Sequence, residues 1–253
     1  MRRRAALIGA AGAAGALAGG CALWRPTPAP LVQRAFTAGG PAAAPRPLVV
    51  LLPGRYMALD ELVDHGFTAA LPALGVEADL LLVDAHMGYY RERSVVQRLH
   101  EDVMLPARRR GVPAVWLAGI SLGGMGALLY DDAYPGEAAG LLLLAPYLGE
   151  PPTVQAVRAA GGLRQWVPPP ATEDDPALGP GPRLWRHLHG LVAQGRPPLY
   201  LGFGERDRFA PGLQVLAEAL PASHVAAGPG GHDWPAWRPA WATLLERLPL
   251  PRR

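Results

Sequence analysis

Ser121 lies in a short motif that can present a hydroxyl group for nucleophilic attack. The motif reads Gly-Ile-Ser-Leu-Gly over residues 119–123, a pattern in which a serine occupies a sharp turn between a strand and a helix. The two glycines let the strand and the helix approach without side-chain collision. The amide of Leu122 then points into the space where an oxyanion would form. An apolar run precedes the motif and a stretch rich in Gly, Ala and Leu follows it, so we expect a buried strand and then a helix.

Two later residues could supply the groups that activate a serine. A serine hydroxyl is a weak nucleophile near neutral pH, so it needs a base within hydrogen-bond reach and a carboxylate that orients this base. Asp207 follows the apolar run 198–204, and His232 follows the short run 224–227. Glu205 is an alternative acid, and each of these side chains could instead have only a structural role. If both runs are parallel strands of one sheet, their carboxyl ends bring the side chains to the same edge.

Segments typical of strands and helices alternate along most of the chain. Short apolar runs and longer segments with helical spacing follow one another from residue 47 onward. This alternation predicts an α/β fold with a mostly parallel sheet and helices on both faces. The predicted strands are 47–52, 78–83, 114–121, 140–146, 198–204 and 224–227, and the predicted helices are 58–74, 93–110, 122–130, 184–194, 213–220 and 234–248.

The order of serine, aspartate and histidine, with the last two placed directly after strands, resembles the α/β-hydrolase superfamily. The resemblance covers residues 47–248 and implies an α/β-hydrolase fold. It also implies a role for each side chain. Ser121 would be the nucleophile, His232 the general base and then the general acid, and Asp207 the group that fixes the imidazole tautomer.

The resemblance further implies two backbone donors for an oxyanion. One is the amide of Leu122, and the other comes from the loop after the first central strand, at Arg55 or Tyr56. Members of the superfamily commonly have His-Gly or a run of glycines in this loop, whereas this chain has Pro-Gly at 53–54. A backbone amide is available from either residue, so both are candidates.

Taken together, these residues predict a serine hydrolase that cleaves a carboxylic ester or thioester through an acyl-enzyme. The expected partner is a small ester or acyl compound, and no cofactor is expected. An acyltransferase with the same triad is an alternative, in which an alcohol or amine replaces water. A non-catalytic exported binding protein with this fold is another, because a fold does not determine a function.

A metal site is not expected from the remaining polar residues. Asp84 and His86 follow a predicted strand, and Asp64 and His65 lie in an earlier segment, but these four lack the spacing of an ordered ligand set. We expect His86, together with Tyr89, either to line the substrate pocket or to lie on the surface.

The first 21 residues resemble an export signal of the bacterial lipoprotein type. Three arginines at 2–4 precede a run of small and apolar residues, and the segment ends at Cys21. The lipoprotein pattern has Leu three residues before the cysteine, whereas this chain has Ala18. Lipidation of Cys21 would hold the protein at the periplasmic face of a membrane; cleavage to a soluble exported protein and an uncleaved terminus are alternatives.

The rest of the chain divides into a linker and one domain. Residues 22–46 are rich in Pro and Ala, which predicts an extended tether, although 31–36 could be a short edge strand. Residues 47–253 form the predicted hydrolase domain, with a Pro-rich cap or lid insertion at about 149–181 that contains at most one short helix. The formal charge of +3 equals the three N-terminal arginines, and the other 21 basic residues balance the 21 acidic ones. Nucleic acid is therefore not an expected partner.

Overall fold

A seven-stranded sheet forms the centre of the protein. The computed structural model describes residues 25–39, 44–170 and 180–253, and the strand order is β1-β3-β2-β4-β5-β6-β7. Six strands are parallel, and β1 at one edge pairs antiparallel with β3. The strands are β1 Gln33–Phe36, β2 Leu48–Leu52, β3 Asp79–Val83, β4 Val115–Ile120, β5 Gly140–Leu144, β6 Leu199–Gly204 and β7 Val225–Gly228. The predicted mostly parallel sheet is confirmed.

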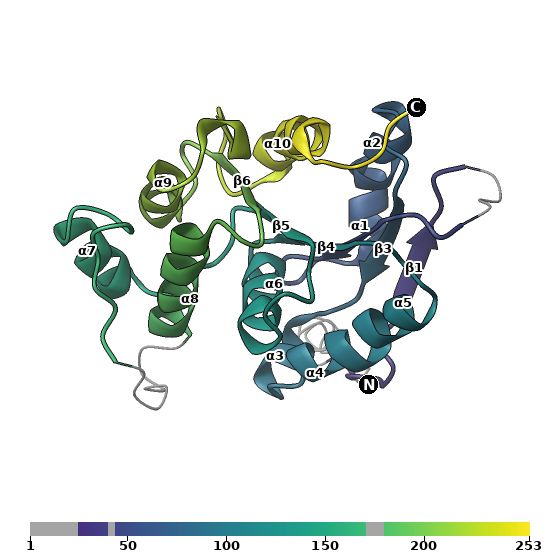
Figure 1. Ribbon diagram of the computed structural model, residues 1–253, viewed down its shortest axis with the longest axis horizontal. Helices are drawn as coiled ribbons and strands as arrows, with labels where there is room; N and C mark the ends of the chain where they lie inside the picture. Colours follow the sequence, from purple (N-terminus) through teal and green to yellow (C-terminus); the bar gives the residue numbers. More distant parts are fainter. Residues whose placement is uncertain (1–24, 40–43, 171–179) are drawn as a thin grey trace, which may run out of the picture.

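Helices cover both faces of this sheet. In Figure 1, α1, α2 and α10 lie on one face, and α3 to α6 lie on the other. Helix α10 packs on β5, β6 and β7, whereas α6 packs on β2, β4 and β5. The helices are α1 Leu59–Asp64, α2 Phe67–Ala73, α3 Met87–Arg91, α4 Val95–Leu99, α5 Leu105–Arg109, α6 Leu122–Ala133, α7 Pro151–Ala159, α8 Gly181–Gln194, α9 Ala210–Glu218 and α10 Trp234–Arg247, with a π-helical turn at His100–Met104 and a 3-10 turn at Ala222–His224.

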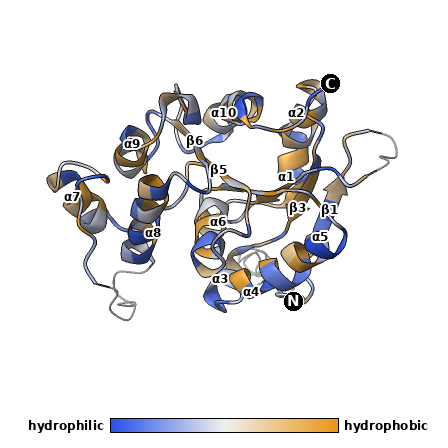
Figure 2. Ribbon diagram, in the orientation of Figure 1, coloured by the Kyte–Doolittle hydropathy of each residue, from blue (hydrophilic) through white to orange (hydrophobic). Residues whose placement is uncertain are grey.

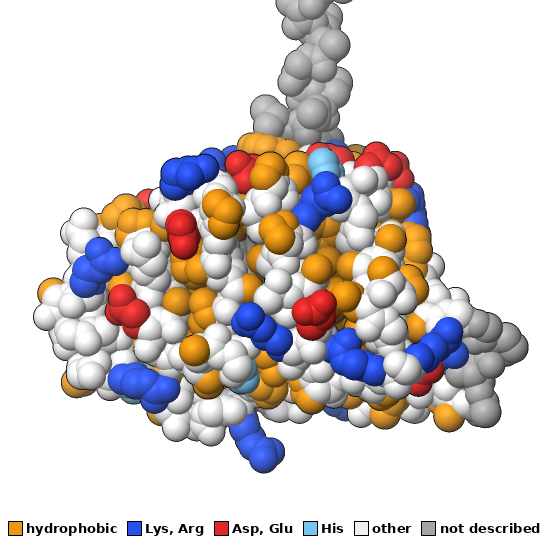
Figure 3. Space-filling view, turned by 90° about the horizontal axis from the view of Figure 1, so that it is seen from above, with side chains coloured by type: hydrophobic (Ala, Val, Ile, Leu, Met, Phe, Trp, Pro, Cys, Tyr) orange, Lys and Arg blue, Asp and Glu red, His pale blue; other side chains and the backbone are white. Residues whose placement is uncertain are grey.

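The central strands are buried along their whole length. Every residue of β2, β4, β5 and β6 is buried, because both faces of the sheet are covered by helices. This explains why these strands are continuous apolar runs rather than alternating ones. Figure 2 shows hydrophobic strands at the centre and helices such as α5 and α8 with both hydrophilic and hydrophobic parts. On the face seen in Figure 3, arginine and acidic side chains are interspersed among hydrophobic and uncharged residues.

Two predicted helices differ from their expected form. The segment 58–74 is divided into α1 and α2, because Gly66 between them has a φ of +80° and ends the first helix. The segment 93–110 is helical but contains the π-helical turn. Pro106, which follows this turn, has no N–H group and cannot donate the usual helical hydrogen bond to the carbonyl of Asp102. The side-chain amide of Gln33 donates a hydrogen bond of 3.0 Å to this carbonyl instead.

The described part of the predicted 22–46 linker is packed on the domain rather than extended away from it. β1 pairs with the exposed edge of β3, so the alternative prediction of an edge strand in 31–36 is confirmed. Leu31 is only 3% exposed, and its N–H donates a hydrogen bond of 2.9 Å to Asp102. The segment therefore buries apolar surface and pairs backbone groups that would otherwise be left at the sheet edge. The predicted signal segment 1–21, including Cys21, lies outside the described residues.

The same N-terminal segment covers the carboxyl end of β3. The carbonyl of Pro26 accepts a hydrogen bond of 2.9 Å from His86 Nε2, and the carbonyl of Pro28 accepts one of 2.7 Å from the Tyr89 hydroxyl. His86 and Tyr89 are 5% and 1% exposed. The alternative in which these two side chains lie on the surface is therefore wrong. They hold the N-terminal segment in place, a role that no local pattern indicates.

The predicted insertion lies between β5 and β6. Helix α7 is the one short helix expected in it, and α8 follows as the chain returns to the sheet. Residues 171–179 of the insertion lie outside the described residues. In Figure 1, α7 and α8 lie beyond the β6 side of the sheet, at the end opposite β1.

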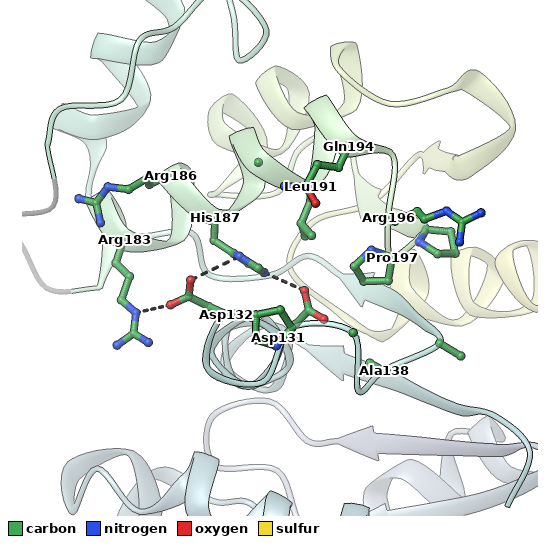
Figure 4. Close-up of a pocket in the computed structure, with 15 residues that line it drawn as sticks. Asp131, Asp132, Ala138, Arg183, Arg186, His187, Leu191, Gln194, Arg196 and Pro197 are labelled. Atoms are coloured by element: carbon green, nitrogen blue, oxygen red, sulfur yellow. Dashed lines mark hydrogen bonds and ion pairs between the residues drawn. The ribbon is translucent and has the colours of Figure 1, made fainter.

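Helix α6, which begins directly after Ser121, is joined to α8 by a network of ion pairs (Figure 4). His187 of α8 lies between two carboxylates at the end of α6, with Nε2 2.8 Å from Asp131 and Nδ1 3.4 Å from Asp132. Arg183 pairs with Asp132 as well. The side chain of Asp131 is only 1% exposed, so the contact with His187 supplies a hydrogen-bond partner that a buried carboxylate needs. The network thus fixes the far end of the helix that begins at the serine.

Replacing His187 by alanine is expected to lower the free energy of unfolding by about 3–5 kcal/mol, because it leaves the buried carboxylate of Asp131 without its partner. Urea denaturation followed by circular dichroism measures this change. Arg108→Ala is the matched control, since it removes an ion pair with Glu137 whose arginine is 62% exposed, and such pairs contribute about 0–1 kcal/mol. Equal stability of the two variants would show that the network does not hold α6.

Candidate active site

Ser121 occupies a tight turn between β4 and α6. Its φ of +53° and ψ of −109° are strained for a residue with a side chain. A Cβ atom on Gly119 would lie 2.3 Å from the carbonyl of Gly123, and one on Gly123 would lie 2.3 Å from the carbonyl oxygen of Leu52. Both positions therefore require glycine, as the motif predicts. The turn leaves the serine at the carboxyl edge of the sheet, with its side chain largely buried.

The three predicted catalytic side chains meet at this edge. Ser121 Oγ lies 2.9 Å from His232 Nε2, and His232 Nδ1 lies 2.7 Å from Asp207 Oδ2. A carboxylate can only accept a hydrogen bond, so Nδ1 carries the proton and Nε2 is left to accept the proton of the serine hydroxyl. The fold brings together residues that are 111 positions apart in the chain. This is the arrangement in which a histidine can remove a proton from serine.

Asp207, and not Glu205, is the acid that contacts the histidine. Asp207 is 4% exposed, and its other carboxylate oxygen accepts a hydrogen bond of 2.8 Å from the N–H of Phe209. Glu205, the alternative acid, is exposed to solvent. Both oxygens of Asp207 are thus engaged, which fixes the plane of the carboxylate and the direction from which it meets His232.

The two candidate residues for the second oxyanion donor lie in a turn next to the serine. Arg55 and Tyr56 follow β2, which pairs with β4, and the turn is closed by a hydrogen bond of 3.1 Å from Met57 N–H to the Gly54 carbonyl. The N–H of Gly54 donates to the sulfur of Met57 at 3.0 Å, so this amide is already engaged. Leu122 is the first residue of α6, and its N–H has no acceptor within the helix.

Aromatic residues surround the histidine, and the sequence analysis did not identify them. Phe209 and Trp237 each contact the imidazole edge to face, with ring centroids 5.0 Å apart in both cases. Tyr147, directly beyond β5, contacts the ring of Phe209. Phe209 lies two residues after Asp207, so its position beside a candidate acid was the one signal that could have indicated it.

Two cavities in the described structure lie away from the triad. The first, of about 1010 Å³, is lined by the end of α6, by one side of α8 and by the segments that precede β5 and β6 (Figure 4). It lies at the amino ends of these strands, at the opposite edge of the sheet from Ser121. The second, of about 420 Å³, lies between α2 and α10. Neither is lined by Ser121, Asp207 or His232.

The described residues contain neither a cluster of metal ligands nor a helix that could span a membrane. Among them, no three or more His, Cys, Asp or Glu side chains are grouped so that they could hold a metal ion. In residues 25–39, 44–170 and 180–253, no helix is both long and apolar enough to span a membrane.

Comparison with known proteins identifies the fold. No family model and no curated protein matches the chain. Solved structures do match it over most of its length, and the three that are described below are each only 13–15% identical to this chain. They include Est1E from Butyrivibrio proteoclasticus with bound ferulic acid, with a TM-score of 0.59, 15% identity and coverage of 85% of this chain and 92% of that one.

Two proteins of Staphylococcus aureus are also similar. The S-formylglutathione hydrolase has a TM-score of 0.55 and 14% identity, with coverage of 81% of this chain and 82% of that one. The substrate-bound fluorophosphonate-binding serine hydrolase F has a TM-score of 0.52 and 13% identity, with coverage of 85% and 97%. With the mostly parallel sheet and the helices on both faces, these likenesses show that the chain has the α/β-hydrolase fold.

Proposed function

We propose that the protein is a serine hydrolase that cleaves a carboxylic ester or thioester through an acyl-enzyme on Ser121. The observation that carries the proposal is the unbroken chain of contacts from Ser121 Oγ to His232 Nε2 at 2.9 Å and from His232 Nδ1 to Asp207 at 2.7 Å. A serine in a strained turn, a base within reach and a buried acid behind the base are the requirements for nucleophilic acyl transfer.

In the first half of the reaction, Ser121 Oγ attacks the carbonyl carbon of the ester as His232 Nε2 takes the hydroxyl proton. The carbonyl oxygen becomes an oxyanion, which the amide of Leu122 and that of Arg55 or Tyr56 would stabilise. The intermediate then breaks its bond to the alcohol or thiol. His232 returns its proton to this leaving group, and an acyl ester on Ser121 remains.

In the second half, water attacks the acyl-enzyme. His232 takes a proton from the water, a second oxyanion forms, and its collapse releases the carboxylic acid while Ser121 Oγ regains the proton. Asp207 holds the Nδ1 side of the ring through its hydrogen bond and would stabilise the imidazolium that forms twice in each cycle. The contacts of His232 with Ser121 and with Asp207 at the carboxyl edge of the sheet support this sequence of steps.

The comparisons support this choice of reaction class. The similar structures include an S-formylglutathione hydrolase and a fluorophosphonate-binding serine hydrolase. These names describe those proteins, and they favour ester or thioester cleavage as the reaction class to test here.

A fluorophosphonate probe tests the proposal directly. The full chain is expected to be labelled once, at Ser121, as located by mass spectrometry of its peptides. A screen of p-nitrophenyl esters of increasing acyl length then identifies the acyl group that the protein accepts. Repeating the assay with added alcohols or amines distinguishes a hydrolase, whose product is the free acid, from an acyltransferase. A folded protein that is neither labelled nor active would overturn the proposal and favour a binding role.

We propose further that the protein is exported and that lipid on Cys21 anchors it at the periplasmic face of a bacterial membrane. The basis is the sequence, in which the only cysteine ends a segment with an arginine-rich start and an apolar centre. Cys21→Ser is expected to move the protein from the membrane fraction to the soluble fraction and to abolish incorporation of labelled fatty acid. If the wild type and the Cys21→Ser variant were found in the same fraction and neither incorporated the fatty acid, lipidation of Cys21 would be contradicted.

A further inference from the structure

The imidazole of His232 lies between two aromatic rings. Phe209 meets it at an interplanar angle of 83° and Trp237 at 90°, each with a centroid distance of 5.0 Å. Edge-to-face contacts of this kind are favourable and depend on orientation. The imidazole makes two hydrogen bonds, one at each ring nitrogen. These bonds leave the ring free to twist about the line that joins the two nitrogens. The aromatic rings beside it are the groups that oppose this twist.

Phe209 contacts the acid as well as the base. Its N–H donates a hydrogen bond of 2.8 Å to Asp207 Oδ1, while its ring contacts His232. A shift of Phe209 would therefore move both partners of the Asp207–His232 hydrogen bond. Trp237, in contrast, contacts the imidazole from α10 and is 4% exposed, so it belongs to the core.

Tyr147, in the segment that follows the adjacent strand β5, supports Phe209. Its ring contacts that of Phe209 at 5.4 Å and 65°, and its N–H donates a hydrogen bond of 3.0 Å to the carbonyl of Ser121. The two residues follow neighbouring strands, β5 and β6. Together, Phe209 and Tyr147 contact all three members of the triad.

Tyr147 is in turn held by the start of the insertion. Its hydroxyl donates a hydrogen bond to Glu150, the residue that precedes α7. Burial, and then the hydrogen bond to Glu150, raise the pKa of Tyr147 to about 12, so the hydroxyl remains a neutral donor near pH 7. The aromatic contact between Tyr147 and Phe209 thus connects the insertion to the catalytic base.

From these contacts we infer that Phe209, supported by Tyr147, is a positioning residue that holds His232 in line for proton transfer with Ser121. The inference rests on the proposed hydrolase function. A base held in the productive orientation speeds the chemical steps without changing how tightly the substrate binds. Loss of the Phe209 ring should therefore lower kcat and leave KM nearly unchanged.

Phe209→Leu tests this role. With the p-nitrophenyl ester that the wild type cleaves fastest, its kcat is expected to fall about tenfold, with KM within about twofold. The rate of fluorophosphonate labelling should fall by a similar factor, because labelling needs the same base. Phe209→Tyr keeps the ring and should restore kcat to within about twofold of the wild type. Phe36→Leu is the matched control, since Phe36 is also partly buried but lies in β1, and its kcat should not change.

The outcomes separate this inference from the proposed function. A wild type that neither hydrolyses esters nor reacts with the probe would reject the hydrolase. An active wild type whose Phe209→Leu variant keeps its kcat, or changes only KM, would reject the positioning role alone. If Phe209→Leu does not fold, Tyr147→Leu removes the supporting ring but keeps the backbone hydrogen bond to Ser121. Its kcat is expected to fall about threefold, and an unchanged kcat would overturn the inference.

Discussion

Replacing Ser121 by alanine is expected to lower ester turnover by about 10⁴-fold or more, because no other group replaces the attacking oxygen. Covalent labelling by a fluorophosphonate should disappear completely. The fold should remain intact, since β4 and α6 pack through side chains other than that of Ser121, which loses only one oxygen atom. Turnover is measured with p-nitrophenyl esters, and the fold by circular dichroism and thermal unfolding.

Ser223→Ala is the matched control for this substitution. Ser223 is exposed in the 3-10 turn before β7, and removal of its hydroxyl should change neither labelling nor turnover. If the Ser121→Ala variant were still labelled, at another residue, the assignment of Ser121 as the nucleophile would be wrong. Full turnover without labelling would indicate a mechanism with no acyl-enzyme.

Replacing Gly123 by alanine is expected to lower turnover by about 100-fold or more and to reduce the free energy of unfolding by about 1–3 kcal/mol. The new Cβ atom would lie 2.3 Å from the carbonyl oxygen of Leu52 and 2.7 Å from that of Pro53. Both are backbone atoms at the end of β2 and cannot rotate away. Either the serine turn or the loop with Arg55 and Tyr56 must therefore move, and both belong to the proposed oxyanion site.

Gly190→Ala is the control for the effect of the added methyl group. Gly190 lies in α8, and no atom lies within 4 Å of the Cβ position there. Alanine also has the higher helix propensity, by up to about 1 kcal/mol, so this variant should be as stable as the wild type or more so. Both glycine variants are compared by urea denaturation and by ester turnover. Wild-type turnover in Gly123→Ala would mean that neither the serine turn nor the oxyanion loop depends on this close approach.

Local patterns were sufficient to predict most of the fold. The central strands are buried on both faces, so each is an uninterrupted apolar run that is visible in the sequence. The turn at Ser121 was predictable because its geometry demands glycine at fixed positions on both sides. Asp207 and His232 could be chosen because parallel strands end at one edge, so residues that follow different strands meet there.

Contacts between distant segments were not predictable in the same way. The N-terminal segment has the composition of a tether, yet it pairs with β3 and covers His86 and Tyr89. The break between α1 and α2 depends on one glycine in a segment whose apolar spacing is helical throughout. In each case, packing or a backbone conformation overrides what local composition favours.

By itself, the sequence determined the order of strands and helices, the serine turn and the three side chains that could form a triad. Only the tertiary structure decided that Asp207 rather than Glu205 meets His232, that Phe209 and Trp237 enclose the imidazole, and that His187 joins α6 to α8. The physical reason is the range of the interactions. Apolar periodicity and glycine requirements act within a few residues, whereas hydrogen bonds, ion pairs and ring contacts depend on how the finished sheet and its helices bring remote residues together.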